Sequence, residues 1–252
     1  MSTFANVSEL HTGYTKVFVI KGNKTILVDT GSRPIPDRMM AYLSEGGFVF
    51  ADQALRKELK QGSLAAITGF LQRENIHIDL IVCTHWHGDH AGNLKELKKM
   101  LGVPAAMHPA DIPFVEGKKE IPFPDRIPED VRQHVQLETC RVDRCLADGE
   151  YVAADVRVIH LPGHTPGSIG LLVNDEILLS GDCLLGRNKM NPKMGLDELN
   201  LPMKPFCMDY DAAVENLYRL RDFKFDAILT GHGVSVQKNG KIKLEALLRA
   251  AG

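Results

Sequence analysis

The sequence predicts an α/β domain in which helices are layered on mixed β-sheets. Short apolar runs typical of strands alternate with segments of helical periodicity along the 252 residues. A hairpin signal, Gly22-Asn23, joins the first two such runs, residues 16–20 and 25–29, so at least one pair of strands is antiparallel. No repeat, low-complexity tract or linker interrupts the chain, and we therefore expect one domain over residues 1–252.

The first half of the chain after the hairpin is expected to form an insert, two helices and one strand. In order, these are the insert with short helices at about 34–62, the helix 63–75 with Ser63 as its N-cap, the strand 79–83 and a helix from about 94 to 102. In the last of these, Leu94, Leu97 and Leu101 share one face, and Gly102 and Pro104 end the helix.

The second half is expected to be strand-rich before it returns to helix. Residues 109–130 are rich in proline and predicted to be irregular, and residues 186–208 have little periodicity and are interpreted as a second insert. The expected elements are strands near 137–145, 151–160, 168–173 and 175–180, a helix at about 209–221, a strand at 226–229 and a last helix near 241–250.

Composition argues against several kinds of partner. The net charge of −2 and the pI of about 6.6 give no overall attraction to nucleic acid or to anionic lipid. No apolar run approaches the roughly 20 residues that span a bilayer, and the N-terminal stretch lacks the apolar segment of a secretory signal. We therefore expect neither a nucleic-acid nor a membrane partner.

Cysteine usage indicates a reducing compartment, and so a cytoplasmic location. The count is odd and no CxxC motif is present, which favours free thiols. Cys140 and Cys145 are close enough in sequence that pairing or metal binding stays open as an alternative. The five cysteines are Cys83, Cys140, Cys145, Cys183 and Cys207.

The stretch CTHWHGDHAG, residues 83–92, carries the strongest chemical signal. Three histidines and one aspartate lie within six positions, in the spacing HxHxDH, directly after the apolar run 79–83. Alternate residues of an extended turn point to one side, so His85 and His87 could share one ion. Imidazole and carboxylate suit zinc, iron and manganese. One loop rarely completes a metal site, and partners are expected elsewhere in the chain.

Three further segments place a histidine or aspartate just past an apolar strand. PGHTPGS (162–168) presents His164, LLSGD (178–182) ends in Asp182, and LTGHG (229–233) presents His232. Sites in α/β folds lie at such strand ends, so these side chains could meet the first motif.

These motifs, in this order, resemble the metallo-β-lactamase fold superfamily, and THWHGDHAGN is similar to the histidine-rich loop of glyoxalase II. The resemblance runs from the N-terminal hairpin to His232. It implies a four-layer αβ/βα sandwich with two mixed sheets and a binuclear metal site at one edge between them.

The resemblance also implies a role for each candidate residue. His85, His87 and His164 would hold one divalent ion, and Asp89, His90 and His232 a second. Asp182 would bridge the two. The ions expected are zinc, with iron or manganese as alternatives. Asp89 and Asp182 would be the catalytic carboxylates, acting first as ligands.

Other candidate residues have weaker signals. Asp29 matches an acidic position common in the family and is interpreted as orienting a ligand, although a simple turn aspartate is an equal alternative. His108 and His160 lie at strand ends and are expected to have structural or supporting roles. His11, His77 and His134 have no partner motif.

The implied activity is hydrolysis of a small ester, thioester or lactone through a metal-bridging hydroxide. True β-lactamases lack a bridging strand-end aspartate, so Asp182 argues against antibiotic hydrolysis. The segment GDCLLGR lacks the tyrosine of quorum-quenching lactonases, and only 20 residues follow His232, too few for the glutathione-binding domain of glyoxalase II. The alternatives are an iron-dependent sulfur dioxygenase, a phosphodiesterase and a non-catalytic sensor.

The two inserts are expected to form facing walls of a site for a small molecule. The segment 186–208 combines flexible thioethers, which line adaptable apolar pockets, with cations that favour an anionic substrate group. An open alternative is that the methionines only cover the core and the lysines are solvated. The residues concerned are Met190, Met194, Met203, Met208, Phe206, Arg187, Lys189, Lys193 and Lys204, facing Met39, Met40, Tyr42, Phe48 and Phe50.

Overall fold

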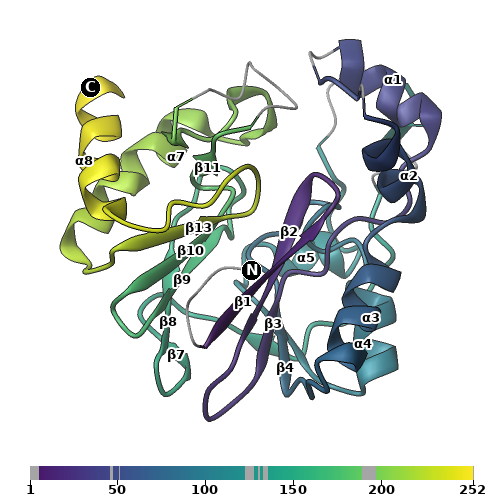
Figure 1. Ribbon diagram of the computed structural model, residues 1–252, viewed down its shortest axis with the longest axis horizontal. Coiled ribbons are helices and arrows are strands. Elements are labelled where there is room, and N and C mark those ends of the chain that lie inside the picture. Colours follow the sequence, from purple (N-terminus) through teal and green to yellow (C-terminus); the bar gives the residue numbers. More distant parts are fainter. Residues whose placement is uncertain are drawn as a thin grey trace.

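The computed structural model describes residues 6–45, 48–50, 52–122, 128–129, 131–132, 136–188 and 197–251. Two mixed β-sheets face each other, and helices cover the outer side of each (Figure 1). This is the four-layer αβ/βα sandwich that the resemblance implies, so the predicted fold class is confirmed.

The first sheet contains six strands in the order β1-β2-β3-β4-β5-β6. The first three are antiparallel neighbours and the rest run parallel. Their bounds are β1 Val7–Thr12, β2 Thr15–Ile20, β3 Ile26–Val28, β4 Leu80–Val82, β5 Ala105–Met107 and β6 Arg144–Cys145.

The second sheet contains five strands in the order β13-β10-β9-β8-β7. Only the pair β10–β13 is parallel. The bounds are β7 Tyr151–Ala153, β8 Val156–His160, β9 Ile169–Val173, β10 Ile177–Gly181 and β13 Ala227–Thr230. A small antiparallel pair, β11 Leu185–Gly186 and β12 Leu199–Asn200, stands apart from both sheets.

Helices divide between the two outer faces. In Figure 1, α3 and α4 lie beside the first sheet, α7 and α8 beside the second, and α1 and α2 at one end next to the β1–β2 hairpin. The bounds are α1 Asp37–Glu45, α2 Gln53–Gln61, α3 Leu64–Arg73, α4 Leu94–Leu101, α5 Ile112–Val115, α7 Tyr210–Leu217 and α8 Gly240–Ala251, with the 3₁₀ helices η2 Lys204–Phe206 and η3 Tyr218–Asp222.

Apolar side chains form one core for each interface between layers. The central cluster joins the facing sides of the sheets, for example Phe18 of β2 and Leu171 of β9. Two outer clusters pack the helices onto the sheets, and a fourth, around Met40 and Leu59, holds the first insert together. Because β4, β9, β10 and β13 are buried on both sides, they read in sequence as continuous apolar runs.

Several element predictions need correction. The strand β1 was not predicted, and of the strand expected at 137–145 only Arg144–Cys145 forms. Ser63 lies at the N-cap of α3, but its hydroxyl accepts a hydrogen bond from the Ser32 amide instead of capping the helix. The segment 186–208 contains β12 and η2 among its described residues. The single domain over 1–252 stays a prediction.

Two further expectations concern the chain as a whole. All five cysteines are unpaired, as the spacing predicts. Among the described residues, no helix combines the length and the apolar character needed to cross a bilayer.

A buried lysine connects the first sheet to the loop after β13. The Lys16 side chain is 2% exposed, and its ammonium donates a hydrogen bond to Ser235 Oγ at 2.6 Å. The same nitrogen lies 3.5 Å from the Glu9 carboxylate. Burial lowers the pKa of Lys16 to about 8, although Glu9 acts in the opposite direction.

This lysine is expected to make the fold more stable as pH rises from about 8 to 10.5. In that window the unfolded chain still holds the proton that the folded state has released, so folding is favoured by raising pH. One pKa unit corresponds to about 1.4 kcal/mol, so the full shift is worth about 3.5 kcal/mol, of which about 2–3 kcal/mol arises between pH 8 and 10.5. The measurement is the free energy of unfolding of wild type and of Lys16→Met in urea titrations at several pH values. The wild-type value minus the variant value should increase by about 2–3 kcal/mol between pH 8 and 10.5. A difference independent of pH would contradict the prediction.

Candidate metal centre

The candidate ligands come from four loops, each following a strand. His85, His87, Asp89 and His90 lie in the loop after β4 of the first sheet. His164, Asp182 and His232 follow β8, β10 and β13 of the second sheet. Both sheets therefore contribute to one cluster of side chains, which includes every residue predicted as a ligand.

The first group of side chains is composed of His85, His87 and His164. Their ring nitrogens lie within 4.8 Å of one another, which is a spacing able to hold a metal ion. His164 Nε2 and His87 Nδ1 are 2.9 Å apart. The His85 ring meets each of the other two edge-on, with centroids 4.7 and 4.8 Å away. Three imidazoles thus face one point.

The second group is composed of Asp89, His90 and His232, again within 4.8 Å. His90 Nε2 and His232 Nε2 are 3.3 Å apart, and Asp89 Oδ2 lies 3.1 Å from His232 Nε2. This group offers two imidazoles and one carboxylate, a set that suits zinc, iron or manganese.

Asp182 lies between the two groups. Its Oδ2 is 3.6 Å from His164 Nε2 in the first group and 3.2 Å from His232 Nε2 in the second, and its Oδ1 is 3.2 Å from His90 Nε2. A Cβ atom at position 231 would lie 2.6 Å from Asp182 Oδ1. Glycine at 231 is therefore required for the loop after β13 to approach this carboxylate.

Four of the histidines are fixed by a partner on the ring nitrogen that faces away from the centre. His85 Nδ1 contacts Thr84 Oγ1 at 3.0 Å, and His90 Nδ1 donates to Asp29 Oδ2 at 2.8 Å. Such outer contacts set the tautomer and orientation of metal-binding histidines. The two remaining pairs are His232 Nδ1 with the Tyr14 carbonyl oxygen at 2.8 Å and His164 Nδ1 with Cys207 Sγ at 3.6 Å.

Two buried ligand atoms that form no hydrogen bond indicate that these side chains are suited to hold metal ions. His85 Nε2 and Asp182 Oδ1 are buried and form no hydrogen bond among the described residues, although His90 Nε2 lies 3.2 Å from Asp182 Oδ1. An unpaired buried polar atom costs about 1–3 kcal/mol. Both atoms belong to groups able to hold an ion, and an ion there would satisfy them.

Electrostatics differ between the two groups. Burial lowers the pKa of His87 to about 3 and that of His164 to about 4, so the first group is neutral. Burial also opposes protonation of His232, but the carboxylates of Asp182 and Asp89 outweigh it and raise the pKa of His232 to about 10. The second group is thus held by ion pairs whose protons a divalent cation would replace.

Asp29 connects the first motif to the first sheet. Its carboxylate accepts hydrogen bonds from the Thr84 amide at 2.7 Å and the Thr84 hydroxyl at 2.9 Å, besides the His90 ring. The backbone of Asp29 is left-handed, with φ 63°, a conformation that aspartate tolerates better than most residues. The structure therefore places Asp29 where it orients His90, as the sequence interpretation proposed.

Asp111 was not singled out in the sequence, although it connects the two loops of the first group. It follows β5 and is fully buried, and it accepts hydrogen bonds from the Trp86 amide, the Thr165 hydroxyl and the Gly167 amide. Burial raises its pKa to about 6. Its position four residues after a strand end was the available signal, but nothing local indicated its partners in a distant loop.

His108 and His160 lie outside the three groups able to hold an ion. Their rings stack, with centroids 3.8 Å apart and an interplanar angle of 13°. His160 Nε2 bonds to the Pro166 carbonyl oxygen, so this pair supports the loop that presents His164.

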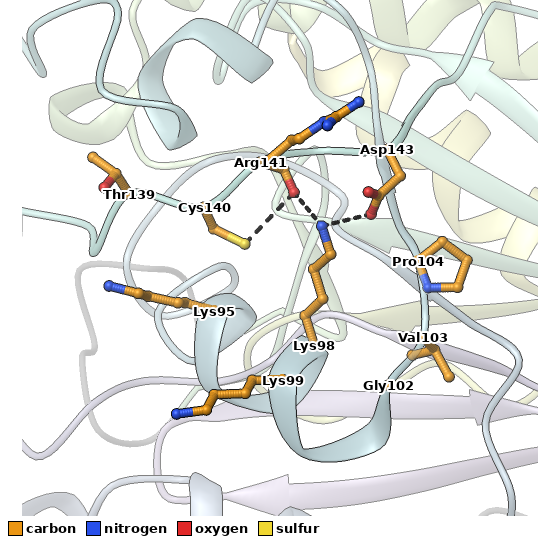
Figure 2. Close-up of a pocket in the computed structure, with 10 residues that line it drawn as sticks. All are labelled: Lys95, Lys98, Lys99, Gly102, Val103, Pro104, Thr139, Cys140, Arg141 and Asp143. Atoms are coloured by element: carbon orange, nitrogen blue, oxygen red, sulfur yellow. Dashed lines mark hydrogen bonds and ion pairs between the residues drawn. The ribbon is translucent and has the colours of Figure 1, made fainter.

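A separate pocket lies between α4 and residues 139–143 (Figure 2). Its volume is about 690 Å³, and Lys95, Lys98, Lys99 and Arg141 give it a basic lining. The Lys98 ammonium bonds to the Arg141 carbonyl oxygen and the Asp143 carboxylate within the pocket. None of the candidate ligands lines it, so it is not part of the metal centre.

Comparisons with known sequences show which family this chain resembles. The family model described as the metallo-beta-lactamase superfamily matches residues 12–232. The Beta-lactamase-like protein 2 homolog of Drosophila melanogaster is 28% identical over 224 residues, which cover 88% of this chain and 59% of that protein. The Probable metallo-hydrolase YflN of Bacillus subtilis (strain 168) is 31% identical over 183 residues, which cover 64% of this chain and 66% of that protein. The chain spans only 55% to 66% of the first three curated relatives.

Solved structures show the same fold. TTHA1623, whose crystal structure is of a di-iron-bound form, superposes with a TM-score of 0.61 and 22% identity, covering 95% of this chain and 96% of that one. At this level of identity the likeness concerns the fold alone.

Proposed function

The chain belongs to the metallo-β-lactamase superfamily, and on that premise we propose that it is a hydrolase that uses two divalent metal ions to cleave a small ester, thioester or lactone. The observation that carries the proposal is the position of Asp182, whose carboxylate contacts the first group through His164 and the second through His90 and His232. A residue so placed is suited to bridge two ions.

In this proposal, the chain's own side chains bind and orient the reactants. The first ion would be held by His85, His87 and His164, the second by Asp89, His90 and His232, and both by Asp182. Two such ions would polarise a substrate carbonyl and lower the pKa of water towards neutrality. Zinc is the proposed metal, with iron or manganese as alternatives.

An apolar wall beside His164 supports a substrate with an apolar group. Phe206 of η2 meets Phe48 of the first insert edge-on, with centroids 6.4 Å apart. The Met208 amide donates to the His164 carbonyl oxygen, so this wall is tied to a candidate ligand. Phe206 and Met208 remain 44% and 42% exposed. We define the apolar wall as Phe48, Phe206 and Met208.

Several other residues of the expected facing walls are reassigned or lie outside the described residues. Met40 and Phe50 are buried in the insert's own core, so they do not face a substrate. Lys189, Met190, Lys193 and Met194 are outside the described residues. Arg187 is exposed and pairs through its backbone with Val234, two residues after His232. Its positive charge near this loop supports a substrate with an anionic group.

A cytoplasmic location, supported by the unpaired cysteines, is part of the proposal.

Phe206→Ala is expected to weaken binding of esters with long acyl chains about tenfold in KM, with kcat and metal content unchanged. A hydrophobic contact of this size is worth roughly 1–3 kcal/mol. Acetyl esters are the short-chain comparison, and their KM is expected to be unchanged. Ile242→Ala, which removes an apolar side chain that is 66% exposed on α8, is the control. Equal KM values for Phe206→Ala and wild type on both substrates would show that the wall does not bind the acyl chain.

The proposed activity is tested by a substrate panel on the as-isolated protein. The panel contains aryl esters, thioesters, lactones and phosphodiesters, with an oxygen electrode to follow sulfur oxidation. We expect hydrolysis of a carboxylic ester, thioester or lactone that stops on chelation and returns with zinc. Phosphodiester cleavage alone, or oxygen uptake that depends on iron, would assign the chain to one of the two alternative activities instead.

A further inference from the structure

The turn between β1 and β2 places a tyrosine over the second group. Thr12 pairs with Thr15, so the turn contains only Gly13 and Tyr14. Gly13 has φ 82°, as required at the first position of such a two-residue turn. A Cβ atom at Gly13 would lie 3.0 Å from the Leu59 side chain. The turn is therefore held closely between the sheet and α2.

Tyr14 contacts the second group through three different parts of the residue. Its carbonyl oxygen accepts the hydrogen bond from His232 Nδ1 at 2.8 Å. Its ring stacks on the His232 imidazole, with centroids 5.5 Å apart and an interplanar angle of 13°. Its hydroxyl lies next to the Asp89 carboxylate.

Only the hydroxyl is unexplained by a structural role. The carbonyl and the ring already orient His232, and phenylalanine would keep both. The ring also packs against the apolar core of the first insert, an environment in which a phenylalanine is equally suited. The hydroxyl of this half-buried residue beside a candidate metal centre therefore calls for a function of its own.

Asp89, next to this hydroxyl, is one of the more exposed candidate ligands. The Asp89 side chain is 18% exposed, whereas those of Asp182 and His232 are 9% and 6% exposed. His164 and His90 are more buried still, at 3% and 0%. His87 of the first group is half-buried as well, so a small molecule would reach the ions past His87 and Asp89. Its oxygen atom would then compete with Asp89 for the Tyr14 hydroxyl.

We propose that Tyr14 is a catalytic residue whose hydroxyl donates a hydrogen bond to the substrate oxygen that gains negative charge during hydrolysis. The inference rests on the proposed hydrolase function. The phenol keeps its proton and no covalent bond to it forms, since a protonated tyrosine hydroxyl is a hydrogen-bond donor. The contribution arises because a fixed donor stabilises developing charge more than it stabilises the ground state.

Tyr14→Phe isolates the hydroxyl, because it keeps the stacked ring and the carbonyl. We expect kcat on the best substrate to fall about 100-fold, the scale for loss of one oxyanion donor, with KM within threefold and two metal ions still bound. Tyr151→Phe is the control, since that side chain is 57% exposed on β7. A kcat within twofold of wild type would overturn the proposal. Loss of metal would also overturn it, by showing that the hydroxyl serves only to hold Asp89.

Binding of inorganic phosphate gives a readout that does not depend on turnover. Calorimetry on the zinc-loaded proteins is expected to show phosphate binding about tenfold weaker to Tyr14→Phe than to wild type or Tyr151→Phe. Equal affinities, or no phosphate binding to wild type, would contradict the role of the hydroxyl. If the wild type hydrolyses no substrate of the panel but the phosphate difference is found, the proposed function fails while Tyr14 remains an oxyanion donor.

Discussion

Replacement of Asp182 by alanine is expected to reduce bound metal from two ions per chain to one or none, and to lower hydrolysis on the order of 1000-fold. The carboxylate is the only candidate ligand whose oxygens approach both groups, at 3.6 Å from His164 Nε2 and 3.2 Å from His232 Nε2. Its removal also deprives His90, His164 and His232 of the carboxylate that all three contact. Several kcal/mol of transition-state stabilisation depend on a correctly held ion.

Elemental analysis of the purified variant, beside its rate on the best substrate, checks this result. Asp143→Ala is a matched control, because it removes a carboxylate from the pocket on α4 (Figure 2) and no candidate ligand. An Asp182→Ala protein that retains two ions per chain would show that Asp182 does not bridge them.

Replacement of Asp29 by alanine is expected to destabilise the metal-free fold by about 3–5 kcal/mol and to weaken metal binding 10–100-fold. Asp29 is 1% exposed and forms a buried pair with His90. Removal of one partner of such a pair leaves the other unsatisfied. The Thr84 amide and hydroxyl lose their acceptor as well. Outer partners of metal-binding histidines typically contribute this much to affinity.

Asp29→Asn separates charge from shape. Asparagine has nearly the same volume and tolerates the left-handed backbone at this position, so the fold should lose less stability than with alanine. Asparagine has only one side-chain oxygen, so it cannot accept the hydrogen bonds from Thr84 and from the His90 ring at once. Metal affinity should therefore still fall. Denaturant unfolding of the stripped proteins and competition with a chelator measure the two effects. Wild-type affinity in both variants would contradict the orienting role of Asp29.

The parts of the fold and site that follow from local pattern were predictable from sequence. The strands β4, β10 and β13 are buried on both sides and read as apolar runs, and each ends beside a candidate ligand. Since carboxyl ends of such strands meet at one edge, the motifs were sufficient to predict that the side chains converge. Their assignment as ligands stays a prediction.

Features that depend on distant contacts were not predictable. β1 is only partly buried and its apolar residues do not form a continuous run, so its pairing with β2 carries its stability. Asp111 and Tyr14 act on loops far away in sequence: Asp111 and Thr165 are 54 positions apart, and Tyr14 and His232 are 218 positions apart. Such contacts form only when the two sheets pack together, so no periodic pattern in the local sequence predicts them.

The central claim, a two-ion centre, is tested most directly by anomalous diffraction from crystals of the zinc-loaded protein. Two peaks are expected, one among His85, His87 and His164 and the other among Asp89, His90 and His232, with the Asp182 carboxylate contacting both. A single peak, or peaks away from these side chains, would contradict the assignment.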